Sequence, residues 1–152
     1  VRTPVGEINV AKKMKEVGAV IGGEGSGGVI LPEAHYGRDA MVGIGLILQM
    51  LSEFNGTLSE LKAGLPQYFI TKSKIELGST DADSILGQVV EKYINTEKVN
   101  TDDGVKIDFA DSWVNLRKSN TEPIVRIIAE AKSKNEAGGL VKRFESEVIR
   151  SF

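Results

Sequence analysis

The chain has 152 residues, of which 41% are hydrophobic and 26% charged, and its formal net charge is −2. These are ordinary values for a globular protein, and a mildly acidic chain has no general attraction for polyanions, so we expect no nucleic-acid partner. The absence of cysteine excludes disulfides, thiolate nucleophiles and cysteine-ligated zinc, and it favours a location in the reducing cytoplasm.

Residues 1–66 predict part of an α/β domain. The expected elements are a basic-faced helix, two short buried strands, a long helix and a short helix, at residues 10–17, 19–21, 29–31, 39–54 and 58–63. The long helix is apolar almost all round, so we expect it to be sandwiched between a sheet and another element. Its most apolar window, 40–51, is only about half the ~20 residues that a membrane helix requires, so we expect no membrane partner. Asp39 is its predicted cap.

A glycine-rich loop, GGEGSGG at residues 22–28, lies between the two short strands. Its glycines let the backbone approach a ligand and leave the Glu24 carboxylate and the Ser26 hydroxyl pointing into the same space, which suits two neighbouring sugar hydroxyls. A phosphate cradle is disfavoured, because Glu24 repels an anion and the loop lacks the Gly-Lys-Ser/Thr ending of a nucleotide loop. On composition alone, a flexible linker is the alternative.

Residues 67–152 predict a second, small α+β domain after a seam near residues 64–67. The expected elements are a strand, a helix, three strands and a closing helix, at residues 68–77, 80–94, 105–109, 113–116, 124–129 and 133–149. Capping boxes are expected at both helices, with Thr80 and Asp83 in the first and Ser133 and Glu136 in the second. The elements together predict an antiparallel sheet with two helices.

The stretch RKSNTEPIVR at residues 117–126 has the composition of a phosphate-binding loop. Guanidinium forks match phosphate oxygens two at a time, and hydroxyl, amide and backbone N–H groups add donors. The candidate phosphate ligands are Arg117, Ser119, Asn120, Thr121 and Arg126. SNTEP is also an ordinary turn sequence, which leaves a purely structural role open. Arg126 stands inside an apolar run, where its charge requires either a bound anion or an internal partner such as Glu122.

GGEGSGG followed by RKSNTEP, with RTPVGEINVAKKM at the start and YGRDA at residues 36–40, resembles the α-D-phosphohexomutases. Within that family the likeness is to the phosphoglucosamine, phosphomannose and phosphoglucose mutases, which interconvert hexose 1-phosphates and 6-phosphates through a bisphosphate. The resemblance implies the carboxyl-terminal part of such an isomerase: the end of its sugar-binding α/β third domain, with a mixed sheet, at 1–66, and its phosphate-binding fourth domain at 67–152. It assigns sugar contacts to Glu24 and Ser26, and phosphate contacts to the loop at 117–126.

The family also uses a phosphoserine loop and a three-aspartate magnesium loop, and neither occurs in this sequence. The resemblance therefore implies no catalytic residue and no metal ligand in this chain. Mg²⁺ would be a cofactor of the parent enzyme, and the partners would be a hexose phosphate and the missing amino-terminal domains. The chain alone is expected to be inactive. The alternative is a non-catalytic module that binds sugar phosphates or other anions.

Some family members carry histidine at the positions that match Glu7 and Gly28, so those histidine roles do not carry over to this chain. From the residues, Glu7 is either a proton acceptor or a surface glutamate. His35, the chain's one histidine, is expected to be a loop residue without a zinc site or a catalytic triad. Arg38 beside Asp39 is expected to form an ion pair or to mark the start of the long helix.

Overall fold

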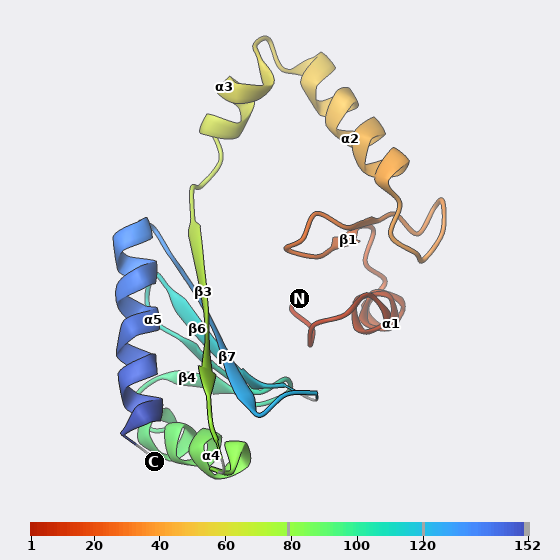
Figure 1. Ribbon diagram of the computed structural model, residues 1–152. Coiled ribbons are helices and arrows are strands. Elements are labelled where there is room, and N and C mark those ends of the chain that lie inside the picture. Colours follow the sequence, from red (N-terminus) through yellow and green to blue (C-terminus); the bar gives the residue numbers. More distant parts are fainter. Residues whose placement is uncertain (79, 120, 151–152) are drawn as a thin grey trace. The chain divides into compact units, whose positions relative to one another are not determined.

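The computed structural model describes residues 1–78, 80–119 and 121–150 (Figure 1). The chain divides into two compact units, Val1–Pro66 and Gln67–Phe152, here called unit 1 and unit 2. Each unit has its own cluster of buried side chains. No helix in the described ranges is long and apolar enough to cross a membrane.

Unit 1 is built from three helices and a small hairpin. Its elements are α1 (Glu7–Val17), β1 (Gly22–Gly23), β2 (Val29–Ile30), α2 (Ala40–Glu53) and α3 (Leu58–Ala63). The strands β1 and β2 pair in antiparallel fashion, and Val10 and Met14 of α1 pack with Ile30 in a small core. Within the described residues the sheet of unit 1 is this pair of strands and not the expected mixed sheet. The buried strand expected at 19–21 is also wrong, because Val20 is 80% exposed.

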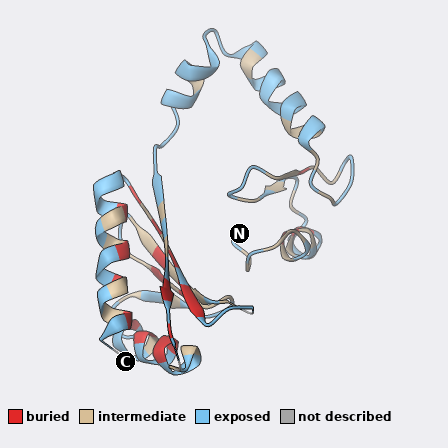
Figure 2. Cartoon of the chain, viewed as in Figure 1, coloured by how far each residue is buried: buried red, intermediate tan, exposed pale blue. Residues whose placement is uncertain are grey.

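Helix α2 confirms its predicted cap and contradicts its predicted burial. The Asp39 Oδ1 atom accepts hydrogen bonds from the backbone N–H groups of Met41 (2.8 Å) and Val42 (3.0 Å). None of the helix's residues is buried, and Met41 and Leu48 are 75% and 59% exposed. The reason is geometric: α2 packs against the two-residue strand β2, which is too short to cover a helix that is apolar on all sides (Figure 2).

Unit 2 is an antiparallel sheet with two helices, as the sequence predicts, but the sheet has five strands where four were expected. Its elements are β3 (Phe69–Glu76), α4 (Ala82–Tyr93), β4 (Lys98–Asn100), β5 (Val105–Asp108), β6 (Trp113–Lys118), β7 (Ile124–Ala131) and α5 (Lys134–Ile149). The strand order is β3-β7-β6-β5-β4, so the last strand lies between the first strand and β6. Strand β4 was not predicted, because three residues carry too little alternation to be recognised.

The two caps of unit 2 give one correction and one confirmation. Helix α4 begins one residue later than expected for a Thr80 cap, because the Asp81 carboxylate accepts the hydrogen bond from the Ser84 N–H (3.0 Å). At α5 the Ser133 hydroxyl accepts from the Glu136 N–H (3.2 Å), which confirms Ser133 as the cap. The Glu136 carboxylate accepts from the Ser133 hydroxyl (3.0 Å) and not from the Ser133 backbone N–H, so the full capping box is not confirmed.

The core of unit 2 lies between one face of the sheet and the two helices. Alternate residues of the strands point to that face, and the largest fully buried side chain is Phe144 of α5 (Figure 2). Phe144 packs with Tyr93 and Phe109 at ring-centroid distances of 5.4 and 6.4 Å. Because this face is covered, the intervening residues of the strands project from the opposite face of the sheet.

A polar cluster joins α4 to α5 beside this core. The Tyr93 hydroxyl donates to Glu147 (2.8 Å) and accepts from the Arg143 guanidinium (2.7 Å), while the Lys92 ammonium lies 3.0 Å from Glu147. Burial raises the pKa of the Glu147 carboxyl, but the hydrogen bonds from Lys92, Tyr93 and Arg143 outweigh it and leave that pKa below its ordinary value of 4.5.

This cluster predicts an acid sensitivity of unit 2. Because the folded-state pKa of Glu147 is depressed, its contribution to the free energy of unfolding is fully present above about pH 4.5 and is lost as pH falls through the lowered pKa. We expect Glu147→Gln to flatten the pH dependence of the urea midpoint below pH 4.5, followed by the fluorescence of Trp113, the chain's one tryptophan. Glu91→Gln, at an exposed position of α4, is the control. Equal pH slopes in the two variants would contradict the assignment.

Candidate functional site

The glycine-rich loop of unit 1 is the tight turn of the β1–β2 hairpin. The Glu24 N–H donates to the Gly28 carbonyl (2.9 Å), and the Gly27 N–H donates to the Glu24 carbonyl (2.9 Å). Gly27 has a φ of 96°, a conformation that favours glycine. The two predicted sugar-binding residues, Glu24 and Ser26, therefore lie on one ordered turn, with Ser26 exposed and the Glu24 side chain 15% exposed.

Arg38 ties this turn to the start of α1. Its Nη1 atom donates to Glu24 Oε2 (3.0 Å), its Nε atom donates to Glu7 Oε2 (2.8 Å), and its backbone N–H donates to Glu7 Oε1 (2.9 Å). The hydrogen bonds from the backbone and then the side chain of Arg38 lower the pKa of Glu7. Glu7 is thus an ion-pair partner of Arg38, and Arg38 pairs with Glu7 and Glu24 instead of with Asp39.

The single histidine stabilises the start of α2. His35 Nδ1 accepts a hydrogen bond from the Gly37 N–H (3.0 Å), so the ring proton lies on Nε2, which donates to Asp39 Oδ2 (3.0 Å). The pKa of Asp39 is lowered first by the hydrogen bond from the Val42 N–H and then by His35. His35 therefore holds, by hydrogen bonds to Gly37 and Asp39, the two residues on either side of Arg38.

The second set of predicted residues lies where β6 and β7 are joined in unit 2. The Ser119 N–H donates to the Ile124 carbonyl (3.0 Å), which closes the connection. The hydroxyl oxygens of Ser119 and Thr121 lie 3.4 Å apart, and the Thr121 N–H lies 3.4 Å from the Ser119 hydroxyl. The two hydroxyl groups thus lie close together in this connection. Asn120 lies outside the described residues.

The register of the sheet aligns three cations. Arg117 of β6 stands opposite Arg126 of β7, and Arg126 stands opposite Lys74 of β3. Each of the three is adjacent in its strand to a buried residue, and residues directly opposite each other point to the same side, so the three share the face that the helices leave uncovered. Like charges directly opposite each other are destabilising, so an anion placed beside these three side chains would stabilise the sheet. Lys74 was not predicted, because the pairing of β3 with β7 joins segments that are distant in the sequence.

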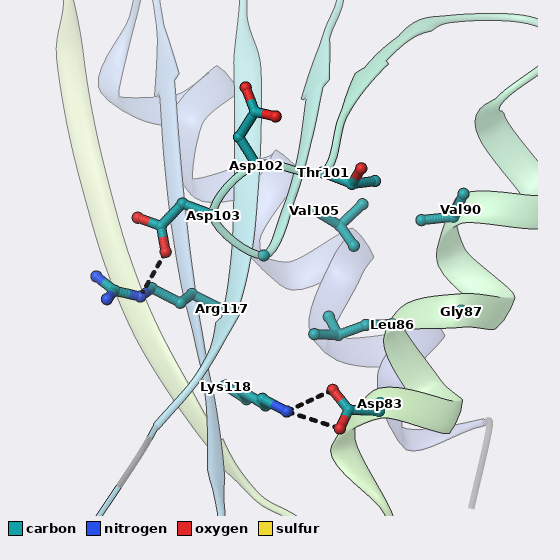
Figure 3. Close-up of a pocket in the computed structure, with 11 residues that line it drawn as sticks. Asp83, Leu86, Gly87, Val90, Thr101, Asp102, Asp103, Val105, Arg117 and Lys118 are labelled. Atoms are coloured by element: carbon teal, nitrogen blue, oxygen red, sulfur yellow. Dashed lines mark hydrogen bonds and ion pairs between the residues drawn. The ribbon is translucent and has the colours of Figure 1, made fainter. Parts of the chain in front are cut away.

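Carboxylates of the chain itself partly neutralise the two arginines of this row. Asp103 lies 2.9 Å from Arg117 Nε (Figure 3), and Glu122 lies 3.6 Å from Arg126, so the internal partner considered for Arg126 is present. The contact to Asp103 uses the Nε edge of the guanidinium. An anion at the two terminal nitrogens of Arg117 is therefore compatible with this ion pair.

A cavity of about 390 Å³ lies beside Arg117, between α4 and the turn from β4 to β5 (Figure 3). On its α4 side the Lys118 ammonium binds both oxygens of Asp83 (2.7 and 2.6 Å). The turn is held close to β6 because Gly104, with a φ of 78°, has no side chain; a Cβ there would lie 2.2 Å from the Leu116 carbonyl oxygen. Gly104 thereby keeps Asp103 within reach of Arg117.

Metal binding has no support in the parts of the chain that the structure describes. Those residues contain no group of three or more histidine, cysteine, aspartate or glutamate side chains placed to hold a metal ion. The Mg²⁺ expected for the parent enzyme therefore has no ligand set in the described ranges.

Two family models match the chain. Residues 1–69 match "Phosphoglucomutase/phosphomannomutase, alpha/beta/alpha domain III", and residues 74–147 match the carboxyl-terminal domain of the same family.

The relatives with similar sequences are much longer than this chain. A phosphoglucosamine/phosphogalactosamine mutase of Sulfurisphaera tokodaii is 38% identical over 148 residues, covering 96% of this chain and 32% of the relative. A phosphoglucomutase/phosphomannomutase of Thermococcus kodakarensis is 40% identical over 137 residues, 90% of this chain and 30% of the relative. The crystal structure of a phosphoglucomutase/phosphomannomutase family protein from Burkholderia thailandensis superposes with a TM-score of 0.74 at 25% identity, over 97% of this chain and 31% of that one. The chain spans about a third of the length of the curated relatives it matches.

The cationic row, which consists of Lys74, Arg126 and Arg117, predicts a measurable charge repulsion in the ligand-free sheet. Lys74→Glu replaces the repulsion opposite Arg126 by attraction, so we expect it to raise the free energy of unfolding by about 0.2–1 kcal/mol relative to a matched variant. The matched variant is Lys72→Glu, because Lys72 is also exposed on β3 and stands opposite Ile128. Urea titration followed by Trp113 fluorescence compares the two, and equal midpoints would contradict the prediction.

Proposed function

The chain belongs to the phosphoglucomutase/phosphomannomutase family, and we propose that it is the carboxyl-terminal, substrate-recognising part of a phosphohexomutase. Such an isomerase interconverts a hexose 1-phosphate and a hexose 6-phosphate through a bisphosphate. Unit 1 orients the sugar, and unit 2 holds the phosphate that is not being transferred. The observation that carries the proposal is the cationic row of unit 2 beside a turn that carries the Ser119 and Thr121 hydroxyl groups.

Phosphate recognition in unit 2 follows from charge and donor geometry. Arg117 and Arg126 supply planar guanidinium groups from neighbouring strands, and Ser119 and Thr121 supply hydroxyl groups from the turn between those strands. A phosphate dianion placed here relieves the repulsion between the arginines and accepts charge-assisted hydrogen bonds. Asn120, which belongs to the same turn in the sequence, is proposed as a further donor.

Sugar recognition in unit 1 follows from the hairpin turn. Hexose hydroxyls both donate and accept hydrogen bonds, and the turn offers the Glu24 carboxylate as an acceptor and the exposed Ser26 hydroxyl as either. The turn is already closed by two backbone hydrogen bonds, so the chain loses little conformational entropy when the sugar binds.

The two recognition sites suit a reaction in which the bisphosphate must bind in two opposite orientations. Contacts to ring hydroxyls and to a distal phosphate are similar in either orientation, so the same residues hold the intermediate whichever phosphate faces the reacting group. Holding the substrate at both ends converts binding free energy into positioning of the reacting oxygen. The phosphoserine and the Mg²⁺ site belong, in this proposal, to other domains of the enzyme, which are this chain's partners.

The proposal predicts a two-site pattern of ligand binding. When isotope-labelled chain is titrated with inorganic phosphate and with glucose 1-phosphate, we expect both to shift the amide resonances of Ser119 and Thr121. Only the sugar phosphate shifts those of Glu24 and Ser26. Arg117→Ala lowers the phosphate affinity by about tenfold, the magnitude of a lost charge-assisted hydrogen bond. Lys98→Ala, at an exposed residue of β4, is the control.

Three outcomes decide between functions. Shifts at both loops support the mutase assignment, whereas shifts at the phosphate turn alone indicate a general anion-binding module. If the amide resonances of neither loop shift, the result contradicts the proposal that this chain binds the sugar phosphate.

The proposal also predicts that the purified chain does not isomerise hexose phosphates, because the phosphoryl-donating serine is not assigned to it. A coupled assay that follows glucose 6-phosphate formed from glucose 1-phosphate measures this. Turnover that is present in the chain and lost in Arg117→Ala would show that the chemistry resides here.

A further inference from the structure

We propose that Arg38 is the positioning residue of the sugar-binding turn: held by Glu7, it fixes the Glu24 carboxylate in the orientation that receives a sugar hydroxyl. The inference rests on the proposed function of Glu24 and deepens it. It adds Arg38, Glu7 and Gly28 to the recognition machinery of unit 1.

The first support is the way Arg38 is anchored. One carboxylate, Glu7, accepts from the Arg38 backbone N–H (2.9 Å) with Oε1 and from Arg38 Nε (2.8 Å) with Oε2. Both ends of the Arg38 residue, main chain and guanidinium, are therefore fixed by the same partner. Because a guanidinium is rigid and planar, fixing its Nε edge also fixes the direction of Nη1, which donates to Glu24 (3.0 Å).

The second support is steric and independent of charge. A Cβ at Gly28 would lie 2.4 Å from Arg38 Cδ and 3.0 Å from Arg38 Cγ, so the stem of Arg38 crosses the space that a side chain at position 28 would fill. Gly28 also closes the turn, since its carbonyl accepts from the Glu24 N–H. The two positions at which some family members carry histidine, Glu7 and Gly28, thus both contact Arg38 in this chain.

The third support is the state of the Glu24 carboxylate. Its Oε2 atom is engaged by Arg38, while Oε1 has no hydrogen-bond partner within the described ranges. One oxygen is thereby held in place and the other remains available to accept from a hydroxyl. The positive charge of Arg38 also offsets the negative charge of Glu24, and that negative charge by itself would repel a phosphorylated sugar.

The test compares variants that remove Arg38 with one that only displaces it. Arg38→Met removes the charge and the donors, Arg38→Lys keeps the charge without the fork, and Gly28→Ala keeps every charge but occupies the path of the Arg38 stem. Two controls match these changes. Lys13→Met removes a cation whose partner is Glu16 on the same helix, and Gly45→Ala adds a methyl group with no atom within 4 Å.

In the ligand arm, labelled chain is titrated with glucose 1-phosphate and with inorganic phosphate. We expect Arg38→Met and Gly28→Ala to lower the sugar-phosphate affinity reported by the amides of residues 23–28 by about tenfold, the loss of one charge-assisted hydrogen bond. Arg38→Lys is expected to restore part of the loss. The affinity for inorganic phosphate that Ser119 and Thr121 report should be the same in all variants. The two control variants should also keep the sugar-phosphate affinity of the unmodified chain. Equal sugar-phosphate affinities in all variants would overturn the positioning role while leaving the proposed function standing.

In the ligand-free arm, hydrogen exchange of the Glu24 amide is measured in the same variants. Because this amide closes the turn, we expect about tenfold faster exchange in Arg38→Met and Gly28→Ala than in the two controls. If the unmodified chain does not respond to glucose 1-phosphate at residues 23–28, the sugar-binding function fails, and the exchange rates still decide whether Arg38 orders Glu24. Unchanged exchange would overturn the inference.

Discussion

The placement of β7 in the centre of its sheet determines most of what unit 2 can do. Hydrogen bonds to β3 on one side and β6 on the other fix β7 residue by residue. With that register, Val125, Ile127 and Ala129 are buried under the helices, and Arg126 must project from the opposite face. The same bonds bring Lys74 and Arg117 beside it. One set of backbone pairings therefore builds the core and concentrates the positive charge, because a strand that buries every second residue presents the others together.

Both candidate recognition sites share a feature, which is that an internal carboxylate holds an arginine in the ligand-free chain. Glu7 holds Arg38 in unit 1, and Asp103 holds Arg117 in unit 2. An arginine fixed in this way loses less side-chain entropy when a ligand binds than one that is free in solvent. In each case the holding contact uses the Nε edge. The terminal nitrogens then serve a second partner, which is Glu24 in unit 1.

Local signals predicted most of the helices and strands, apart from β4 and the strand wrongly expected at 19–21, whereas the contacts between distant segments had to come from the structure. Asp39 and Ser133 were recognised as caps because an N-cap acts within three residues. Asp81 displaced Thr80 as the cap of α4, because neighbouring residues of equal capping ability compete. The burial of α2 was overestimated, since an apolar pattern reports a need for a partner and not its presence. The partnership of Arg38 with Glu7, 31 residues away, leaves no trace in local spacing.

The internal carboxylates also set a threshold for what can bind at the cationic row. A ligand that approaches Arg117 and Arg126 meets Asp103 and Glu122, whose charges already offset part of the field. A monovalent anion such as chloride gains little beyond these contacts, because it carries one charge and no fixed geometry. A phosphate ester carries close to two charges and three oxygens that match guanidinium forks. In the proposed phosphate site, these ion pairs would favour phosphate over weaker anions, because they raise the requirement for both charge and shape.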